Sequence, residues 1–367
     1  TDETFSSRNS KNVTFQRSIM SEALGIAGHK NYSDGDNHGF AATIGGDIGS
    51  FHHNLLANCY GRNWSMGGGA DASGAYAGRL DIFNNVVYNW GSRTTDGGAH
   101  EVNFVGNYYK VGTAMETSKL MTLQIEGNLA GTQSVYVAGN VRDNMNGTLT
   151  QDKLNDTYNL QILDGRGSLS WEPFVDKPFF PSYAKIETAV EAYKSVLSDV
   201  GAGLPVTDAT DARIINETLT RTYTYTGSKS GIKGQIDDEA DAGGYEAYPE
   251  EAYGDDFDTD LDGLPNWWED ICGTNVNSPA DDFTDSNADA DGDGFTALED
   301  YLDFMAQPNY VVAADETVTV NVADLFMGYT KAPSYAVTAC NDKLQAAISG
   351  GTLTVKPTAD KFIGELT

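Results

Sequence analysis

A short pattern, apolar–x–apolar–x–small–Asn–apolar, recurs in the first half of the chain and limits its fold more than any other feature. It occurs in the segments SFHHNL (50–55), IFNNVVY (82–88), VNFVGNYY (102–109), LQIEGNL (123–129) and VYVAGNV (135–141). Asn85, Asn107 and Asn128 are 22 and 21 residues apart, whereas Asn54 and Asn140 fall at less regular distances. One short strand in each period of about 20–25 residues is typical of a solenoid.

The apolar residues of these segments alternate with period two, whereas a helical repeat would show a period of about 3.6. We therefore predict a mainly β protein with a right-handed parallel β-helix over residues 1–165, in which stacked asparagines, Asn107 and Asn128 among them, hydrogen-bond one another in a ladder. Forty glycines, nineteen tyrosines and only 21% charged residues agree with a turn-rich β chain. An irregular β-sandwich is the alternative, but it does not explain the recurring Gly-Asn.

Residues 166–250 are predicted to form a C-terminal wrap with helices, because the apolar ends of a β-helix need a cover. Val190, Tyr193, Leu197 and Val200 have helical spacing and are followed by Gly201. Asp208 stands where the N-cap of a second helix is expected.

The charge of the chain excludes some classes of partner. A net charge of −30 argues against nucleic acid and anionic membranes. No apolar run reaches the roughly eighteen residues of a membrane span. The chain opens on TDETFSSRNS without a signal-like segment, so we expect further residues upstream in the complete protein.

Residues 251–308 form an acidic segment that predicts calcium. Fifteen Asp or Glu and no Lys or Arg lie between residues 255 and 300. Two stretches match the EF-hand loop D-x-D-x-D-G-x5-E, in which carboxylates and one backbone carbonyl bind Ca2+. The expected ligands of the first loop are Asp258, Asp260, Asp262, the Leu264 carbonyl and Glu269; those of the second are Asp289, Asp291, Asp293, the Phe295 carbonyl and Asp300.

These loops are interpreted as a calcium-binding spacer that joins two parts of the chain. A dockerin-like pair that binds a cohesin partner is the less favoured alternative, because Trp267 and Trp268 indicate local packing rather than a recognition helix. Residues 309–367 alternate as strands and are predicted to be an immunoglobulin-like β-sandwich, present in part.

The run SFHHNLLANCYGRN followed by LDIFNNVVYNWG resembles the HHN…R…NN-V-Y-N-W run of family 1 pectate lyases. The segments NVTFQRSIMSEAL (12–24), NHGFAATIGG (37–46) and GGAHEVNFVGNYYK (97–110) resemble the adjacent turns of that family. The resemblance covers about residues 1–245. It implies a secreted bacterial enzyme, expected as a monomer, that cleaves the anionic polysaccharide polygalacturonate by calcium-assisted β-elimination.

The resemblance also implies roles for individual residues. Arg62 stands at the position of the catalytic base. The family's catalytic lysine has no clean counterpart, and Lys30 and His38 are candidates. The chain reads NWSMGGG where many members carry a second arginine that holds a substrate carboxylate. Arg79, Arg93 and Lys30 are the candidates to replace that arginine, Arg79 before the other two, and Trp64 is expected as a further substrate contact. In the family, the calcium ion of the substrate groove is bound by acids one turn before the histidines. These positions correspond to Asp2 and Glu3 here, and Ser6 stands where a second acid is usual.

The pair His52 and His53 does not predict a metal site. Adjacent residues of a strand point to opposite faces, so one ion cannot easily bind both. We expect one ring in the interior and the other on the surface.

Three other functions stay open. The first is a lyase for another uronate polymer, because the second arginine is missing. The second is a β-helix hydrolase that uses Asp96 and Glu101 as paired carboxylates. The third is a non-catalytic glycan-binding protein.

Overall fold

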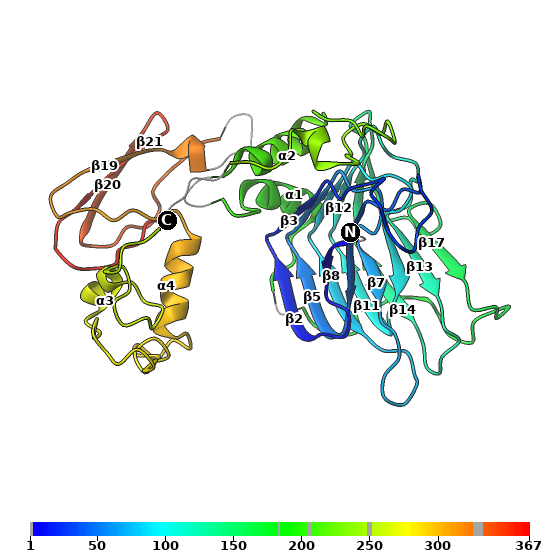
Figure 1. Ribbon diagram of the computed structural model, residues 1–367, viewed down its shortest axis with the longest axis horizontal. Helices are drawn as coiled ribbons and strands as arrows, with labels where there is room; N and C mark the ends of the chain where they lie inside the picture. Colours follow the sequence, from blue (N-terminus) through cyan, green and yellow to red (C-terminus); the bar gives the residue numbers. More distant parts are fainter. Residues whose placement is uncertain (1–2, 183, 204–206, 248–251, 326–332) are drawn as a thin grey trace. The chain divides into compact units, whose positions relative to one another are not determined.

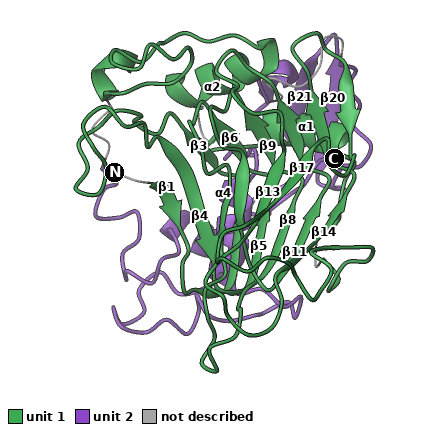
Figure 2. Ribbon diagram, turned by 90° about the vertical axis from the view of Figure 1, so that its right-hand side faces the viewer, with its two compact units in different colours: residues 1–203, 207–245 green, residues 204–206, 246–367 purple. Residues whose placement is uncertain are grey.

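The computed structural model describes residues 3–182, 184–203, 207–247, 252–325 and 333–367. The chain divides into two compact units (Figure 2). The first comprises residues 1–203 and 207–245, and the second comprises residues 204–206 and 246–367. The predicted division of the chain into four parts is finer than these two units and stays a prediction.

Three sheets of six strands make up the strand-rich part of the first unit (Figure 1). The first sheet contains β1 (Glu3–Ser6), β4 (Phe40–Gly45), β7 (Ser65–Gly67), β10 (Thr95–Gly98), β13 (Met121–Ile125) and β17 (Tyr158–Ile162). The second contains β2 (Lys11–Gln16), β5 (Asp47–His52), β8 (Arg79–Phe83), β11 (Glu101–Val105), β14 (Ser134–Ala138) and β18 (Phe174–Val175). The third contains β3 (Ile19–Ser21), β6 (Leu55–Ala57), β9 (Val86–Tyr88), β12 (Tyr108–Lys110), β15 (Val141–Asp143) and β16 (Leu149–Gln151).

The chain visits the three sheets in turn, so neighbouring strands of each sheet come from successive turns of the chain. β5, for example, pairs in parallel with β2 and β8. In the described residues, the strand pairs of these sheets are parallel except β15 with β16. This topology confirms the predicted parallel β-helix.

The interior of the β-helix is apolar and aromatic. Phe51, Trp64, Ile82, Phe104 and Tyr109 all belong to one buried cluster. Their alternation with outward residues is what the period-two pattern predicted.

The predicted asparagine ladder exists, but its members differ in part from the prediction. The amide of Asn54 donates to Asn85 at 3.0 Å, Asn85 to Asn107 at 3.1 Å, and Asn107 to Asn140 at 2.9 Å. All four side chains are buried. The inclusion of Asn128 was wrong, because this residue is exposed and its side chain accepts from Arg166.

Two helices follow the strands, α1 (Ala189–Ser198) and α2 (Ala209–Thr220). Asp208 caps α2 as predicted, accepting from the Asp211 amide at 2.7 Å. The expected buried stripe of α1 was wrong in one member, because Val190 is exposed and Ala189, Ala192 and Val196 are buried instead. A short 3-10 helix, η1 (Glu239–Ala242), follows.

The helices pack against the outward residues of the third sheet. Val196 and Ile214 share one buried cluster with Leu55, Val86 and Tyr108. The wrap therefore covers a lateral face of the β-helix, and this contact corrects the expectation that it closes an end. The outward residues of β6, β9 and β12 are apolar, so they need this cover.

The described residues of the second unit form α3 (Asn266–Cys272), α4 (Ala297–Ala306), η2 (Val322–Leu325) and three strands, β19 (Val318–Asn321), β20 (Leu344–Ser349) and β21 (Thr352–Pro357). The strands form an antiparallel sheet in the order β19-β21-β20. One such sheet is found in the described residues after 309, so the immunoglobulin-like sandwich stays a prediction. No helix in the described ranges has the length and apolar character to cross a membrane.

Candidate functional site

Arg62 lies in the segment just before β7, beside β4 of the first sheet. The carbonyls of Gly61 and Arg62 accept from the amides of Ala41 and Ala42 at 2.9 and 3.0 Å, so this segment runs beside β4. Arg62 has φ +52°, in the left-handed region that is uncommon for a residue with a Cβ. The same conformation recurs at other turns of the β-helix, among them His53, Asn84 and Asn89.

The guanidinium of Arg62 forms an ion pair with Glu3 of β1. Thr43 of β4 donates to the same Glu3 oxygen at 2.5 Å, and Arg8 lies 3.6 Å from it. Arg62 and Glu3 are each about one-seventh exposed, at 15% and 14% of their side-chain surface. Glu3, predicted as a calcium ligand, is therefore the counter-ion of the predicted base.

A second arginine reaches the same place through Phe40. The Arg62 guanidinium carbon lies 4.3 Å from the centre of the Phe40 ring, and that of Arg93 lies 5.2 Å from it. Both distances are within the range of cation–π attraction. Arg93 also pairs with Asp96, one of whose carboxylate oxygens is buried with no protein partner. Two cations therefore meet on one aromatic ring.

Two residues of this group, Thr43 and Asp96, lie in one row on the outer face of the first sheet. Thr43, Ser65, Asp96 and Thr122 are in register on four adjacent strands. Their neighbours along the strands, such as Ile44 and Met66, belong to the interior cluster, so the row faces outward. Sequence reasoning found Arg62 and Arg93 but missed Thr43, and nothing in the sequence singled out Phe40 as the platform between the two arginines.

The two candidates for the missing lysine differ in their surroundings. His38 is buried, its ring stacks on Tyr32 at 4.7 Å, and its Nδ1 lies 3.1 Å from the Asp36 carbonyl oxygen. Its Nε2 is buried without a protein partner, and Tyr32 in turn lies 6.2 Å from Phe40. Lys30 is exposed on the preceding turn. Of the two, His38 has a chain of ring contacts to the Arg62 group.

Arg79 and Trp64 do not join this group. Arg79 begins β8 of the second sheet and binds both carboxylate oxygens of Asp47, at 2.8 and 3.2 Å. This hydrogen bond lowers the pKa of Asp47. The prediction that Trp64 contacts substrate is wrong, because its side chain is fully buried in the interior beside Phe51. Trp64 lies in the turn before β7, and its side chain enters the interior cluster.

The two carboxylates proposed for hydrolysis lie on different sheets. Asp96 is on β10, in register with Ser65 of the first sheet, and Glu101 is on β11, in register with Arg79 of the second. The hydrolase alternative therefore has no pair of carboxylates on one face at these positions.

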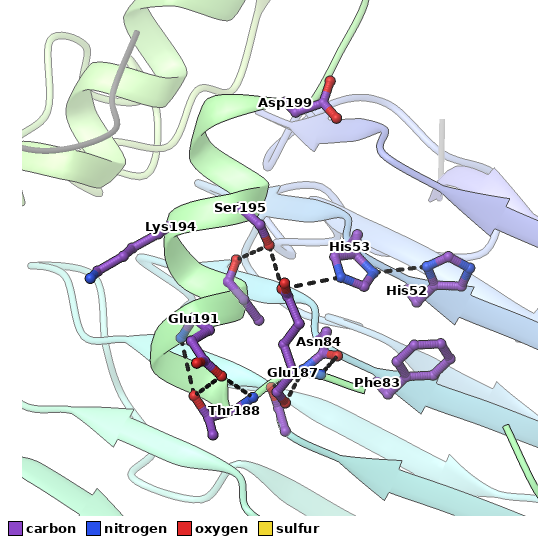
Figure 3. Close-up of polar contacts among 12 residues, drawn as sticks. His52, His53, Phe83, Asn84, Glu187, Thr188, Glu191, Lys194, Ser195 and Asp199 are labelled. Carbon is purple, nitrogen blue, oxygen red and sulfur yellow. Dashed lines mark hydrogen bonds and ion pairs between the residues drawn. The ribbon is translucent and has the colours of Figure 1, made fainter. Parts of the chain in front are cut away.

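The histidine pair forms a structural hydrogen-bond chain (Figure 3). The Nδ1 atoms of His52 and His53 are 2.9 Å apart, His53 Nε2 lies 3.4 Å from Glu187, and Ser195 donates to Glu187 at 2.6 Å. Both rings are buried, which corrects the expectation that one is on the surface. The left-handed backbone of His53, at φ +54°, ends the alternation on which that expectation rested.

This chain is not a nucleophilic triad. A triad needs the imidazole between the hydroxyl and the carboxylate, whereas here Glu187 lies between Ser195 and His53. Burial lowers the pKa of His52 to about 4, and burial also lowers that of His53. Neutral rings thus tie β5 to the segment before α1.

The first acidic loop has the geometry of a cation site. One oxygen from each of Asp258, Asp260 and Asp262 lies within 4.8 Å of the others. Asp260 and Asp262 are buried, and Glu269 is fully buried. One carboxylate oxygen each of Asp260, Asp262 and Glu269 has no protein partner. Burial and the nearby Asp260 and Asp262 raise the pKa of Glu269 to about 7.

Unpartnered buried carboxylate oxygens carry a high energetic cost, which a cation would remove. Hard oxygen donors in this arrangement are the ligands that Ca2+ prefers. The residues of the first loop therefore fit a calcium ion. Leu264, whose carbonyl is the expected ligand at position 7, is buried in the same loop.

The second loop repeats the motif in a more exposed setting. Oxygens of Asp289, Asp291 and Asp293 also lie within 4.8 Å of one another, but all three residues are exposed. Burial and the neighbouring acids raise the pKa of Asp300. Phe295, whose carbonyl is the expected ligand, is exposed as well. The two loops thus share a motif and differ in burial.

The helices after the loops pack against each other. Trp268 of α3 lies 5.4 Å from Tyr301 and 5.3 Å from Phe304 of α4, between ring centres. Trp267 contacts the same two rings at 6.1 and 6.0 Å. The interpretation of the tryptophans as local packing is confirmed.

The acids beside Arg62 and Arg93, as far as the structure describes them, are paired with these arginines. Glu3 pairs with Arg62, and Asp96 pairs with Arg93. In the described residues, the groups of three converging acids are those of the two loops. Asp2, the other predicted groove ligand, lies outside the described residues.

Comparisons with known proteins show a distant structural likeness. No family model and no curated protein matches the chain. Among solved structures, the chain is similar to "Structure of the thermostable pectate lyase PL 47", with a TM-score of 0.33 and 16% sequence identity. The alignment covers 55% of this chain and 54% of that chain, so it spans about half the length of each.

Proposed function

We propose that the first unit is a polysaccharide lyase that cleaves polygalacturonate by β-elimination, with Arg62 at the centre of its site. The observation that carries the proposal is the meeting of the Arg62 and Arg93 guanidiniums on the Phe40 ring. Arginine is suited to binding a carboxylate, because its planar fork matches the two oxygens. A uronate polymer repeats such carboxylates along its length.

The reaction needs a base at one carbon of the sugar. The base takes the proton from C5, the electron pair forms the C4–C5 double bond, and the bond from C4 to the bridging oxygen breaks. The bridging oxygen then takes a proton and leaves with the departing chain. Positive charge near the carboxylate stabilises the negative charge that develops as the proton departs.

Arg62 is assigned as the base, and Arg93 as the cation beside the substrate carboxylate. In the free protein Arg62 is the charged partner of Glu3. It acts as the base in its neutral guanidine form, after one proton has passed to solvent, and the neutral nitrogen then takes the C5 proton. Arg93 stays charged beside the substrate carboxylate, and Thr43 still donates to Glu3. No step is assigned to a groove calcium, because Glu3 and Asp96 are both occupied by arginines.

The test compares Arg62→Lys with the unchanged chain on polygalacturonate. Turnover, followed by the ultraviolet absorbance of unsaturated uronides, should fall roughly 10²–10⁴-fold, the usual contribution of a proton-transfer group. Binding of oligogalacturonate, followed by calorimetry, should persist. Arg142→Lys is the matched control, because Arg142 bonds to Asn144 and the Ser118 carbonyl, away from the Phe40 ring.

Unchanged turnover in Arg62→Lys would remove Arg62 from the reaction. New reducing ends without the ultraviolet signal would show hydrolysis in place of elimination. Binding without turnover of any uronate polymer would favour the non-catalytic glycan-binding alternative.

We also propose that both acidic loops bind Ca2+ and that the ions hold the second unit together. The first loop supports this most directly, through the unpartnered oxygens of Asp260, Asp262 and Glu269. The proposal is tested by calcium removal, as set out in the Discussion.

A further inference from the structure

A cavity of about 250 Å³ opens on the outer face of the first sheet, where β7 and β10 end. Its lining includes Met66, Gly67, Gly98, Gln124 and Gln133. Gly67 and Gly98 pair in register, two residues beyond Ser65 and Asp96 on the same strands, so the cavity lies beside the row of Thr43, Ser65, Asp96 and Thr122. At a rise of about 3.3 Å per residue, the cavity begins roughly 7 Å from that row.

Gly98 and Gly67, which both line the cavity, differ in the space that a side chain would have. A Cβ at Gly98 would lie 2.6 Å from the Gln124 carbonyl oxygen and 2.8 Å from Gln133 Nε2, so only glycine fits. A Cβ at Gly67 would meet nothing nearer than 3.5 Å. The backbone at Gly67 therefore accepts a side chain, and the absence of one leaves the floor of the cavity open.

The polar groups of the cavity are amides. Gln133 is buried, with 4% of its surface exposed, and its Oε1 accepts from the Glu126 amide at 3.3 Å. The Gln133 carbonyl also accepts from Trp171 at 2.9 Å, which fixes this residue in place. Gln124 donates to Gln161 at 2.9 Å on the next strand. Amides donate and accept at once, as sugar hydroxyls do.

The remaining walls are apolar and carry little charge. Tyr76, Met66 and Leu129 line the cavity, and Glu126 is the one charged residue in its lining. A uronate carboxylate here would face Glu126 with no cation among the lining residues. Ring C–H groups of a sugar suit the apolar walls, and its hydroxyls suit the two glutamines.

We propose that this cavity binds a neutral, hydroxyl-rich sugar unit of the polysaccharide whose uronate lies at Arg62. The inference rests on the proposed function and adds to it a preference for uronate polymers in which neutral sugars accompany the acid units. Arg62 and Arg93 thus bind the acid unit, and the cavity lined by Gln124 and Gln133 binds the neutral unit beside it.

The test is a ratio of two affinities, measured by calorimetry on the whole chain in an Arg62→Lys background so that turnover does not consume the probes. One probe is an oligomer of galacturonate. The other has equal length and alternates galacturonate with rhamnose, a neutral sugar. The ratio of the second affinity to the first should be above one, and Gly67→Leu should lower it about tenfold, or about 1.4 kcal/mol.

Gly167→Leu is the matched control, because a Cβ at Gly167 meets nothing within 4 Å and this glycine does not line the cavity. Gln124→Leu should also lower this ratio of affinities. It replaces Gly67→Leu in the test if Gly67→Leu is unfolded at the temperature of the measurement. A ratio of one in the background protein, or a ratio unchanged in a folded Gly67→Leu or Gln124→Leu variant, would overturn the inference. Continued turnover in the Arg62→Lys background would instead contradict the proposed function.

Discussion

The amide of Asn107 in the β-helix and the carboxylate of Glu269 in the second unit are both buried and polar, yet their surroundings are opposite. Asn107 donates to Asn140 and to the Ile82 carbonyl, and accepts from Asn85. Glu269 is fully buried and keeps an oxygen without a protein partner. The asparagine ladder is satisfied within the protein, whereas the first acidic loop leaves oxygens of Asp260, Asp262 and Glu269 without a protein partner. The first unit should thus be stable by itself, and the second should depend on its ligand.

The largest expected effect is the response to calcium removal. A chelator should expose cleavage sites between residues 255 and 300, because this stretch holds fifteen acids and no Lys or Arg, and the acids repel one another. Residues 1–240 should stay resistant. Limited proteolysis with a calcium-independent protease measures both, and re-addition of calcium is the control. Equal cleavage with chelator and with excess calcium would show that the loops do not bind the ion.

The stability of the second unit should depend on pH through Glu269, in contrast to the asparagine ladder, which has no titrating group. The pKa of Glu269 is raised from 4.5 to about 7 in the folded chain, so the folded state holds a proton that the unfolded state releases. Without calcium, this contribution is present below about pH 4.5 and is lost as the pH rises through about 7. Saturating calcium should reverse the trend, because the ion needs the ionised carboxylate.

Hydrogen exchange of peptides from residues 255–306, measured at acid and neutral pH, tests this reversal. Glu269→Gln is the matched variant, and its calcium-free form should lose most of the pH dependence in this range. A calcium-free second unit that becomes better protected as the pH rises would contradict the assignment.

The smallest expected effect concerns the asparagine ladder. Asn107→Ala removes donors to Asn140 and Ile82 and leaves buried groups without partners, which should lower the free energy of unfolding by about 1–3 kcal/mol. Asn128→Ala should cost less, because Asn128 is exposed outside the ladder. Denaturant unfolding of the two variants gives the comparison. Equal losses would mean that the ladder does not distinguish buried from exposed asparagines.

Some features of this protein follow from its sequence because they depend on local spacing. Period-two alternation that ends at an asparagine marks one strand of a turn, and a β-helix is the fold that stacks such strands. Each turn also contributes strands to two further sheets, which the repeat did not predict. The acidic loops are equally local, since Asp258 to Glu269 fall within one short stretch. Asp208 as the cap of α2 is local in the same way.

Tertiary structure decided the features that depend on residues distant in the chain. Asn128 has the sequence pattern of the ladder, but its left-handed backbone lies on an exposed turn, and only the stacking of turns places Asn140 beside Asn107. The two loops share one motif but differ in burial. Their burial depends on contacts such as the packing of α3 on α4, which the motif does not specify. The site shows the same limit: local sequence marked Arg62, whereas the contacts with Glu3 and Phe40 arise because successive turns of a parallel β-helix bring 3, 40 and 62 side by side.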